Sequence, residues 1–217
     1  MTTYILRRLI QGMFIIIIVT LLVFVVIRLL PGDPILIYLA EEMVETLTQE
    51  QIDVARQEFG LDKPMMVQYI DWMSGLFRGD FGTSIFYREK VGKLLAQRMP
   101  ITMHLGFMAF IVSTFFGLMA GLISALRRGT WIDTVTTSFA NLGITIPVFW
   151  LGILLIYYFG LKLRLLPIHG YTSPMEDLWL STRQAIMPVF CLALGSLSGL
   201  ARQTRSSMLE VLRQDYI

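Results

Sequence analysis

The polar residues that could support chemistry in this sequence are few and scattered. The two histidines, His104 and His169, do not belong to an H-E-x-x-H zinc motif. Gly92-Lys93 lacks the earlier glycine of a phosphate-binding loop. The segment 195–199, Gly-Ser-Leu-Ser-Gly, is close to a nucleophile elbow, but its serine-to-glycine offset is wrong. We therefore predict no catalytic residue, no metal site and no cofactor, and we disfavour an intramembrane enzyme.

Three residues interrupt the otherwise apolar segment 138–161. Asn141, Thr145 and Pro147 lie close together in the segment 138–161. A proline inside a membrane-spanning segment frees a backbone carbonyl, which must be satisfied by protein or by water in a cavity. The group is a candidate lining for a solute pathway, and a merely kinked packing helix is the alternative.

The last sixteen residues, 202–217, form a polar and basic stretch with one apolar stripe. Leu209, Leu212 and Tyr216 follow helical spacing, with Met208 beside them. This pattern fits an interfacial helix on lipid headgroups. It also fits a helix that transmits force to a cytoplasmic protein, and the sequence leaves both interpretations open.

The composition indicates the environment in which these elements lie. Hydrophobic residues make up 55% of the 217 residues. Charged residues make up 16%, which is less than the roughly 25% of a typical soluble protein. An ordinary cytosolic domain and a disordered chain are both excluded by these proportions. The net charge of +2 gives no footprint for nucleic acid. The lone Cys191 can form neither an internal disulfide nor a thiolate metal site.

Four segments are long and apolar enough to cross a lipid bilayer, which requires about 20 residues. They are residues 9–27, 101–126, 138–161 and 185–201. The first is preceded by basic residues like a signal peptide, but it is longer than the usual apolar region and lacks a small-x-small cleavage site. We therefore predict an all-α, polytopic helix bundle whose first span is a retained anchor.

Two pairs of glycines have the GxxxG spacing that lets membrane helices approach closely. The pairs are Gly117 with Gly121 and Gly195 with Gly199. We predict that they serve helix packing, either inside one subunit or between two subunits.

Basic residues beside the spans predict the orientation of the chain. Seven arginines flank the first, second and fourth spans on what would be one side of the membrane. They are Arg7, Arg8, Arg127, Arg128, Arg202, Arg205 and Arg213. Placing these residues in the cytoplasm puts the N-terminus inside, although Lys162, Arg164 and Arg183 in the last external connection argue mildly against it.

The long segment 31–100 is predicted to be an organised, helical region outside the membrane. A capping-box spacing at 48–51 opens one helix that ends at Gly60, and Pro64 opens another. A separate amphipathic helix is expected from Val91 to Met99, before Pro100 and the second span. The apolar stripes of this region fit a packed cap on the membrane face, docking of an external partner, or both.

Taken together, these residues resemble the permease subunits of ATP-binding-cassette importers for dipeptides, oligopeptides and nickel. The resemblance runs from one end of the sequence to the other. It rests on the segments at 4–9, 30–34, 60–64, 79–84, 98–102, 143–150, 166–171, 205–212 and 215–217, each weak alone and strong in this order. Thr145 stands where a serine is usual, and Gln184-Ala185-Ile186-Met187-Pro188 replaces a more typical His-Leu-Ile-Leu-Pro.

The resemblance implies six spanning helices in a complete subunit, of which four are expected here. It divides the chain into an N-terminal anchor helix at 1–30, an extracytoplasmic region at 31–100 and the start of the permease domain at 101–217. It also implies a coupling helix that docks into ATPase subunits, and residues 215–217 end just before that motif. The sequence is therefore expected to be truncated at its C-terminus.

The implied mechanism is alternating access in the plasma membrane of a bacterium or archaeon. The implied partners are a second homologous permease, two cytoplasmic ABC ATPases, an extracytoplasmic substrate-binding protein and the lipid bilayer, with no nucleic acid. Candidate pathway residues are Asn141, Thr145, Pro147 and Trp150. Candidate residues of the lead-in to ATPase coupling are Arg205, Glu210, Leu212, Arg213, Asp215 and Tyr216. A freestanding channel or membrane scaffold is the alternative function, and the transported solute cannot be read from this sequence.

Overall fold

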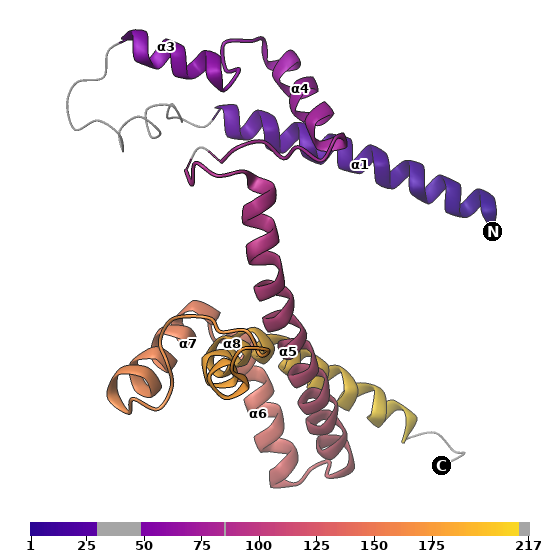
Figure 1. Ribbon diagram of the computed structural model, residues 1–217. Coiled ribbons are helices and arrows are strands. Elements are labelled where there is room, and N and C mark those ends of the chain that lie inside the picture. The colour runs from indigo at the N-terminus through magenta and orange to yellow at the C-terminus, as the bar shows by residue number, and fades with distance from the viewer. Residues whose placement is uncertain (30–48, 85, 213–217) are drawn as a thin grey trace. The chain divides into compact units, whose positions relative to one another are not determined.

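The computed structural model describes residues 1–29, 49–84 and 86–212. Its regular elements are helices, and the described residues include one isolated β-bridge, between Thr83 and Lys90, and no β-strand. The chain divides into two compact units, Met1–Gln97 and Arg98–Ile217, which are described separately. The helices of both units are shown in Figure 1.

The first unit contains a long apolar helix and two shorter helices. Helix α1 runs from Thr2 to Leu29 and includes the predicted span at 9–27. Its 28 residues correspond to a length of about 42 Å. Helix α3 covers Gln49–Glu58, and helix α4 covers Met65–Phe77 after Pro64. The predicted capping residue Thr48 lies outside the described residues.

The ends of these shorter helices follow the local sequence signals. Gly60 has a φ of 64°, and its N–H donates to the carbonyl of Gln57 at 3.0 Å, so α3 ends where a left-handed residue was predicted. After α4, Gly79 and Gly82 also have positive φ. The N–H of Gly82 donates to Oδ1 of Asp80 at 3.0 Å, which closes the glycine-rich turn at 79–82.

Helix α5 runs from Val91 to Leu126 without interruption and contains Pro100. The prediction of a separate helix ending before Pro100 is therefore wrong. A proline removes one backbone donor from a helix, but a helix can continue past it where its neighbours supply the remaining bonds. The approach helix and the second predicted span are one element.

The third predicted span is not one straight helix. Helix α6 covers Trp131–Thr145, helix α7 covers Val148–Leu155, and the π-helical segment η1 covers Ile156–Lys162. The direction of the chain changes by 102° between α6 and the segment Val148–Lys162. Pro147 explains the break, because proline disfavours helical geometry in the residue before it, and Ile146 is extended with ψ of 122°.

Helix α8 runs from Leu178 to Val211 and joins two predicted elements. It starts with Asp177 as a cap, whose Oδ1 accepts the N–H of Leu180 at 2.9 Å. It continues through Pro188 and the fourth predicted span at 185–201 into the tail, which was predicted as a helix of its own. The described part of the tail is thus a rigid extension of a spanning helix.

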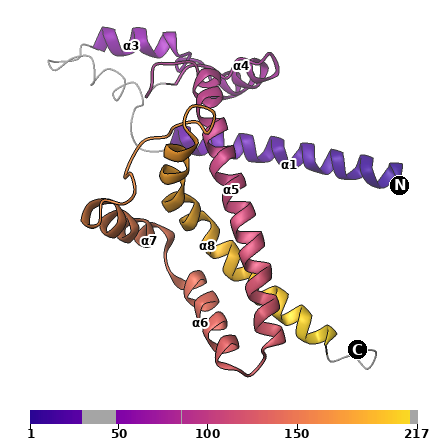
Figure 2. The ribbon, with the colours of Figure 1, turned by 60° about the horizontal axis from the view of Figure 1, so that its bottom comes forward.

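Small residues form the core between α5 and α8. Ala109 of α5 packs with Ala185, Val189 and Ala193 of α8. Around them lie the partly buried Leu105, Met108 and Val112. Figure 2 shows α8 crossing α5, with the turn between α5 and α6 near the end to which α8 extends. Most large apolar side chains point outward, as they do when lipid rather than water surrounds a bundle. The predicted polytopic helix bundle is confirmed.

Candidate functional site

A buried acid lies at the start of α6. Asp133 belongs to the first turn of the helix, directly after the turn at 127–130 that connects it with α5. Gly129 in this turn has a φ of 76°, and its N–H donates to Oδ2 of Asp133 at 3.0 Å. A carboxylate is stabilised at this position by the free N–H groups at the start of a helix. The local sequence therefore places the negative charge at the α5–α6 turn.

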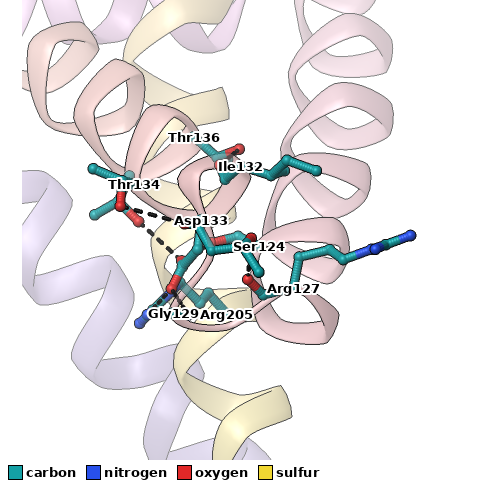
Figure 3. A network of polar contacts seen from close by, with 10 residues as sticks. Ser124, Arg127, Gly129, Ile132, Asp133, Thr134, Thr136 and Arg205 are labelled. Carbon is teal, nitrogen blue, oxygen red and sulfur yellow. Dashed lines mark hydrogen bonds and ion pairs between the residues drawn. The ribbon is translucent and has the colours of Figure 1, made fainter.

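Arg205 of α8 pairs with this carboxylate through two parallel bonds (Figure 3). Nε donates to Oδ1 at 2.7 Å, and Nη2 donates to Oδ2 at 2.9 Å. Asp133 is only 6% exposed. Two-point pairing of this kind fixes the orientation as well as the distance of the two groups. The pair thus connects α6 and α8, which are separated by 72 residues in sequence.

A hydroxyl from α5 completes the arrangement. Ser124, which is 1% exposed, donates its Oγ–H to Oδ1 of Asp133 at 2.5 Å. Thr137, one turn further along α6, contacts the same oxygen at 3.4 Å. A buried charge is expensive unless its hydrogen-bonding capacity is filled. Helices α5, α6 and α8 thus meet at one carboxylate. If α8 moves relative to α6, either this contact breaks or α6 moves together with α8. We call Ser124, Asp133 and Arg205 the acid–arginine joint.

Close helix contacts support the joint from inside the bundle. A Cβ at Gly117 would lie 2.9 Å from Cβ of Leu200, and one at Gly121 would lie 2.6 Å from the carbonyl oxygen of Ala201. At both glycines, α8 therefore packs so closely against the α5 backbone that no side chain would fit between the two helices. On α6, a Cβ at Gly143 would collide with Oγ of Ser198. That hydroxyl is fully buried and finds no hydrogen-bond partner among the residues that the structure describes.

A cavity of about 200 Å³ lies between α6 and α8 beside the joint. Its lining residues include Arg205 of the joint and Asn141, one of the predicted pathway residues. The complete lining is Ser124, Thr136, Thr137, Ala140, Asn141, Ala201, Arg202, Arg205 and Ser206. The structure thus brings one predicted pathway residue and one predicted coupling residue to the same cavity.

The other predicted pathway residues lie elsewhere. The hydroxyl of Thr145 donates to carbonyls of its own helix, those of Asn141 and Leu142, at 3.0 and 3.1 Å. Pro147 lies at the bend, and Trp150 lies on α7 with its side chain half exposed. These residues surround the bend between α6 and α7 rather than a common pocket.

The predicted coupling residues differ in their surroundings. Arg205 is committed to Asp133 within the chain, whereas Glu210 and Leu212 lie exposed at the end of α8. Arg213, Asp215 and Tyr216 lie outside the described residues. Among the second glycine pair, Gly195 and Gly199 have open space where a Cβ would stand, so they do not contact another helix of the described chain.

A second contact fixes the other end of the bundle. Nδ1 of His104, early in α5, and the hydroxyl of Tyr171, just before α8, lie 3.1 Å apart and share a hydrogen bond. The start of α5 therefore lies near the start of α8, at the His104 end of the bundle. Both helices run from there toward the Asp133 end. Between α5 and α8, the chain must therefore run back from the Asp133 end to the His104 end. The bent pair of α6 and Val148–Lys162 makes this one return. Among the described residues, three helices, α1, α5 and α8, are long and apolar enough to span a membrane, and the bent pair counted as one span makes a fourth candidate.

Sequence reasoning missed Asp133, the buried partner of Arg205, and Ser124, whose hydroxyl bonds the same carboxylate. Asp133 is the only acidic residue from Val91 to Met175, a signal that could have marked it as special. Ser124 carries no comparable signal, because serine is common in membrane helices. No group of three potential metal ligands occurs in the part of the chain that the structure describes.

Comparisons with known proteins agree with this architecture. Residues 117–217 match the family described as binding-protein-dependent transport system inner membrane component, and residues 1–106 match its N-terminal family. The chain is 36% identical over its full length to a probable peptide ABC transporter permease protein of Sinorhizobium fredii, covering 68% of that protein.

Two further relatives have similar names. A putative peptide transport system permease protein of Brucella abortus is 37% identical over the full chain, which covers 68% of it. The di/tripeptide transport system permease protein DppB of Pseudomonas aeruginosa is 35% identical over 92% of the chain and 64% of that protein. The chain is a multi-pass inner membrane protein, and it belongs to the family of binding-protein-dependent transport system inner membrane components.

Proposed function

We propose that this chain forms half of the translocation pathway of an ATP-driven importer for peptides. The names of the similar permeases, all of peptide systems, support this solute class. Nickel and other small solutes remain the alternatives that the sequence left open. ATP hydrolysis is assigned to two separate cytoplasmic ATPase subunits. A second homologous permease supplies the other half of the pathway, and an external binding protein delivers the solute.

The acid–arginine joint is the observation that carries the mechanical part of the proposal. Helix α8 extends as one element from the packed core to the end of the described chain. Arg205 holds that extension to α6 at 2.7 Å from the Asp133 carboxylate. A push on the end of α8 by an ATPase is therefore passed to α6, and through Pro147 to the bent segment that follows. Glu210, Leu212, Arg213, Asp215 and Tyr216 are proposed to lie nearest that ATPase surface.

The same end of the bundle supports the predicted orientation. Arg127 and Arg128 belong to the α5–α6 turn, and Arg202 lies on α8 close to Arg205. The joint keeps these basic residues on one side, which supports a cytoplasmic location for them. The N-terminus, with Arg7 and Arg8 before the first span, is then cytoplasmic as well.

The pathway is proposed to run beside the bend. Asn141 lines the cavity between α6 and α8, and Thr145, Pro147 and Trp150 continue toward α7. Alternating access then consists of a shift of α6 and the bent segment against α8, which opens this side first outward and then inward. No bond is made or broken in the permease itself.

Reconstitution tests the proposal. The full-length subunit is placed in liposomes with its second permease and the two ATPases, and the external binding protein is added with a labelled dipeptide or tripeptide. Uptake that requires both ATP and the binding protein is expected. Arg205→Lys, which keeps the charge but loses the two-point geometry, should lower uptake more than it lowers binding-protein docking.

Two results would contradict the proposal. Solute flow through the subunit without ATPases would favour the freestanding channel. Recovery of a homo-oligomer alone, with no second permease or ATPase after gentle detergent extraction, would favour a membrane scaffold.

A further inference from the structure

Helix α4 packs against the part of α1 that is predicted to lie in lipid. The hydroxyls of Thr20 and Tyr69 lie 3.0 Å apart and share a hydrogen bond. The ring of Phe24 contacts the rings of Tyr69 and Trp72, with centroid distances of 5.4 and 6.1 Å. Thr20 and Phe24 belong to the apolar run at 9–27, and the first charged residue after it is Arg28.

The helix rise converts these contacts into a depth. Phe24 is four residues and Thr20 eight residues before Arg28, which corresponds to about 6 Å and 12 Å along α1. Arg28 lies at the end of the apolar run, with its guanidinium over the ring of Phe24 at 5.3 Å, and a long basic side chain marks the lipid–water interface. Tyr69 and Trp72 therefore reach below the level of Arg28. Aromatic residues with one polar end are typical of this level.

The surface of α4 beside this contact is apolar, and no residue that the structure describes covers it. Met66, Ile70 and Phe77 lie on one face of the helix, about 100° from the face of Tyr69 and Trp72. Their exposed fractions are 66%, 60% and 85%. No charged residue shares this face.

The polar residues of α4 lie on the opposite side and are held there. Oδ2 of Asp71 accepts a bond from Nζ of Lys63 at 2.7 Å. The side-chain amide of Gln68 donates to the carbonyl of Lys63 at 2.7 Å. Asp71 raises the pKa of the Lys63 ammonium above its ordinary value, first through this hydrogen bond. The segment before α4 thus covers its polar face, while the apolar face is exposed among the residues that the structure describes.

We propose that α4 is a membrane-interface helix that lies in the lipid headgroup layer at the C-terminal end of α1. Met66, Ile70 and Phe77 enter the hydrocarbon, and Asp71 and Gln68 face water. The occupant of the apolar face is lipid, because the face continues the lipid-exposed surface of α1 at a depth fixed by Thr20 and Phe24. An amphipathic helix in this position buries its apolar face about 5–10 Å deep, which matches the depth of the Phe24 contacts. The proposal does not depend on the solute or on transport.

Site-directed spin labelling tests it. The full chain, with the subunits that co-purify with it and with Cys191 and any other cysteine replaced by Ala, is placed in nanodiscs of phosphatidylcholine. Labels are introduced through Met66→Cys, Ile70→Cys and Phe77→Cys, and through Asp71→Cys on the opposite face. Asp53→Cys on α3 is the water reference, since Asp53 is exposed. The collision rates of each label with oxygen, which concentrates in lipid, and with a water-soluble nickel chelate are compared.

The three apolar positions should favour oxygen, whereas Asp71→Cys and Asp53→Cys should favour the chelate. A fluorescent label at Met66→Cys and Phe77→Cys provides a second measurement. It should be quenched more by lipids with a nitroxide near the headgroup than by lipids with a nitroxide at the chain end.

Equal preference for the chelate at all five positions would overturn the proposal. So would protection of Met66→Cys and Phe77→Cys from both reagents, or a change in their accessibility that occurs only when the external binding protein is added. The last two results would show that a protein covers this face.

Discussion

Asp133 and Arg205 form a two-point ion pair that links the first turn of α6 to the extension of α8, with N–O distances of 2.7 and 2.9 Å. The carboxylate is almost completely buried, and Ser124 from α5 donates to it as well. One side chain thus joins the consecutive helices α5 and α6 to α8, whose Arg205 lies 72 residues further along the chain.

Loss of the carboxylate should destabilise the bundle. In Asp133→Ala the partly buried guanidinium of Arg205 loses its partner, and leaving a hydrogen-bonding group unsatisfied in this way costs about 1–3 kcal/mol. The unfolding free energy in mixed micelles, measured by denaturant titration, should fall by that amount. Glu176→Ala removes an exposed acid and should change it by less than about 0.5 kcal/mol.

The double variant Asp133→Leu with Arg205→Leu separates charge from packing. It removes both buried charges and should recover part of the lost stability, because a buried ion pair replaced by apolar groups is often neutral. Uptake should stay low, since the rigid link between α6 and α8 is lost. A double variant less stable than Asp133→Ala would show that the pair itself is a net source of stability.

The two glycine pairs should respond differently to alanine. Gly121→Ala places a Cβ 2.6 Å from the backbone oxygen of Ala201, so α5 and α8 must separate, at a cost of about 1–3 kcal/mol. Gly199→Ala enters open space and should raise helix stability by about 0.5–1 kcal/mol. Thermal unfolding of the purified subunit measures both changes.

Co-purification with the second permease tests whether Gly195 and Gly199 contact another subunit. If Gly199 contacts another subunit, Gly199→Ala should leave the isolated subunit stable and weaken co-purification of the second permease. Similar losses in the isolated subunit for both variants would contradict the packing described for α5 and α8.

The contact between Gly143 and Ser198 should show compensation. Gly143→Ala collides with Oγ of Ser198 and should lower stability by about 1–3 kcal/mol. Ser198→Gly in the same chain removes the obstacle and should restore much of this loss.

Ser198→Ala alone is the control. Its hydroxyl is buried without a partner in the described part of the chain, so its removal should be neutral or stabilising by about 1 kcal/mol. A large loss in Ser198→Ala would mean that the hydroxyl is bonded in the assembled protein.

Replacement of Pro147 should straighten the third crossing. Pro147→Ala restores the missing N–H and removes the restriction on Ile146, so α6 can extend toward α7. The 102° bend should open, which a longer distance between spin labels at Phe139→Cys and Tyr158→Cys would report. An unchanged distance would show that packing against α8, rather than the proline, sets the bend.

Much of this protein could be predicted from local patterns. Long apolar runs predicted four crossings, because lipid requires continuous apolar surface of a set length. Gly60 and Pro64 predicted the end of α3 and the start of α4, because their effects act on their own backbone or on the residue next to them. The order of the short segments also indicated the family.

Whether a proline ends a helix was harder to predict. Pro100, Pro147 and Pro188 are all prolines in apolar surroundings, yet only Pro147 breaks its helix. The local cost of a proline is similar at each site, and the contacts of the surrounding helices decide whether the chain bends there or continues.

The candidate site depended on tertiary structure almost entirely. The sequence identified Arg205 as a polar residue at the end of a spanning helix, but its partner Asp133 lies 72 residues away. Likewise, the spacing of both glycine pairs is the same, and only the packing of α8 determines that Gly117 and Gly121 face another helix while Gly195 and Gly199 do not. Hydropathy and helical period are properties of neighbouring residues, so they determine the crossings and the faces. The choice of partner across the bundle depends on how whole helices pack, and therefore only the three-dimensional structure decides it.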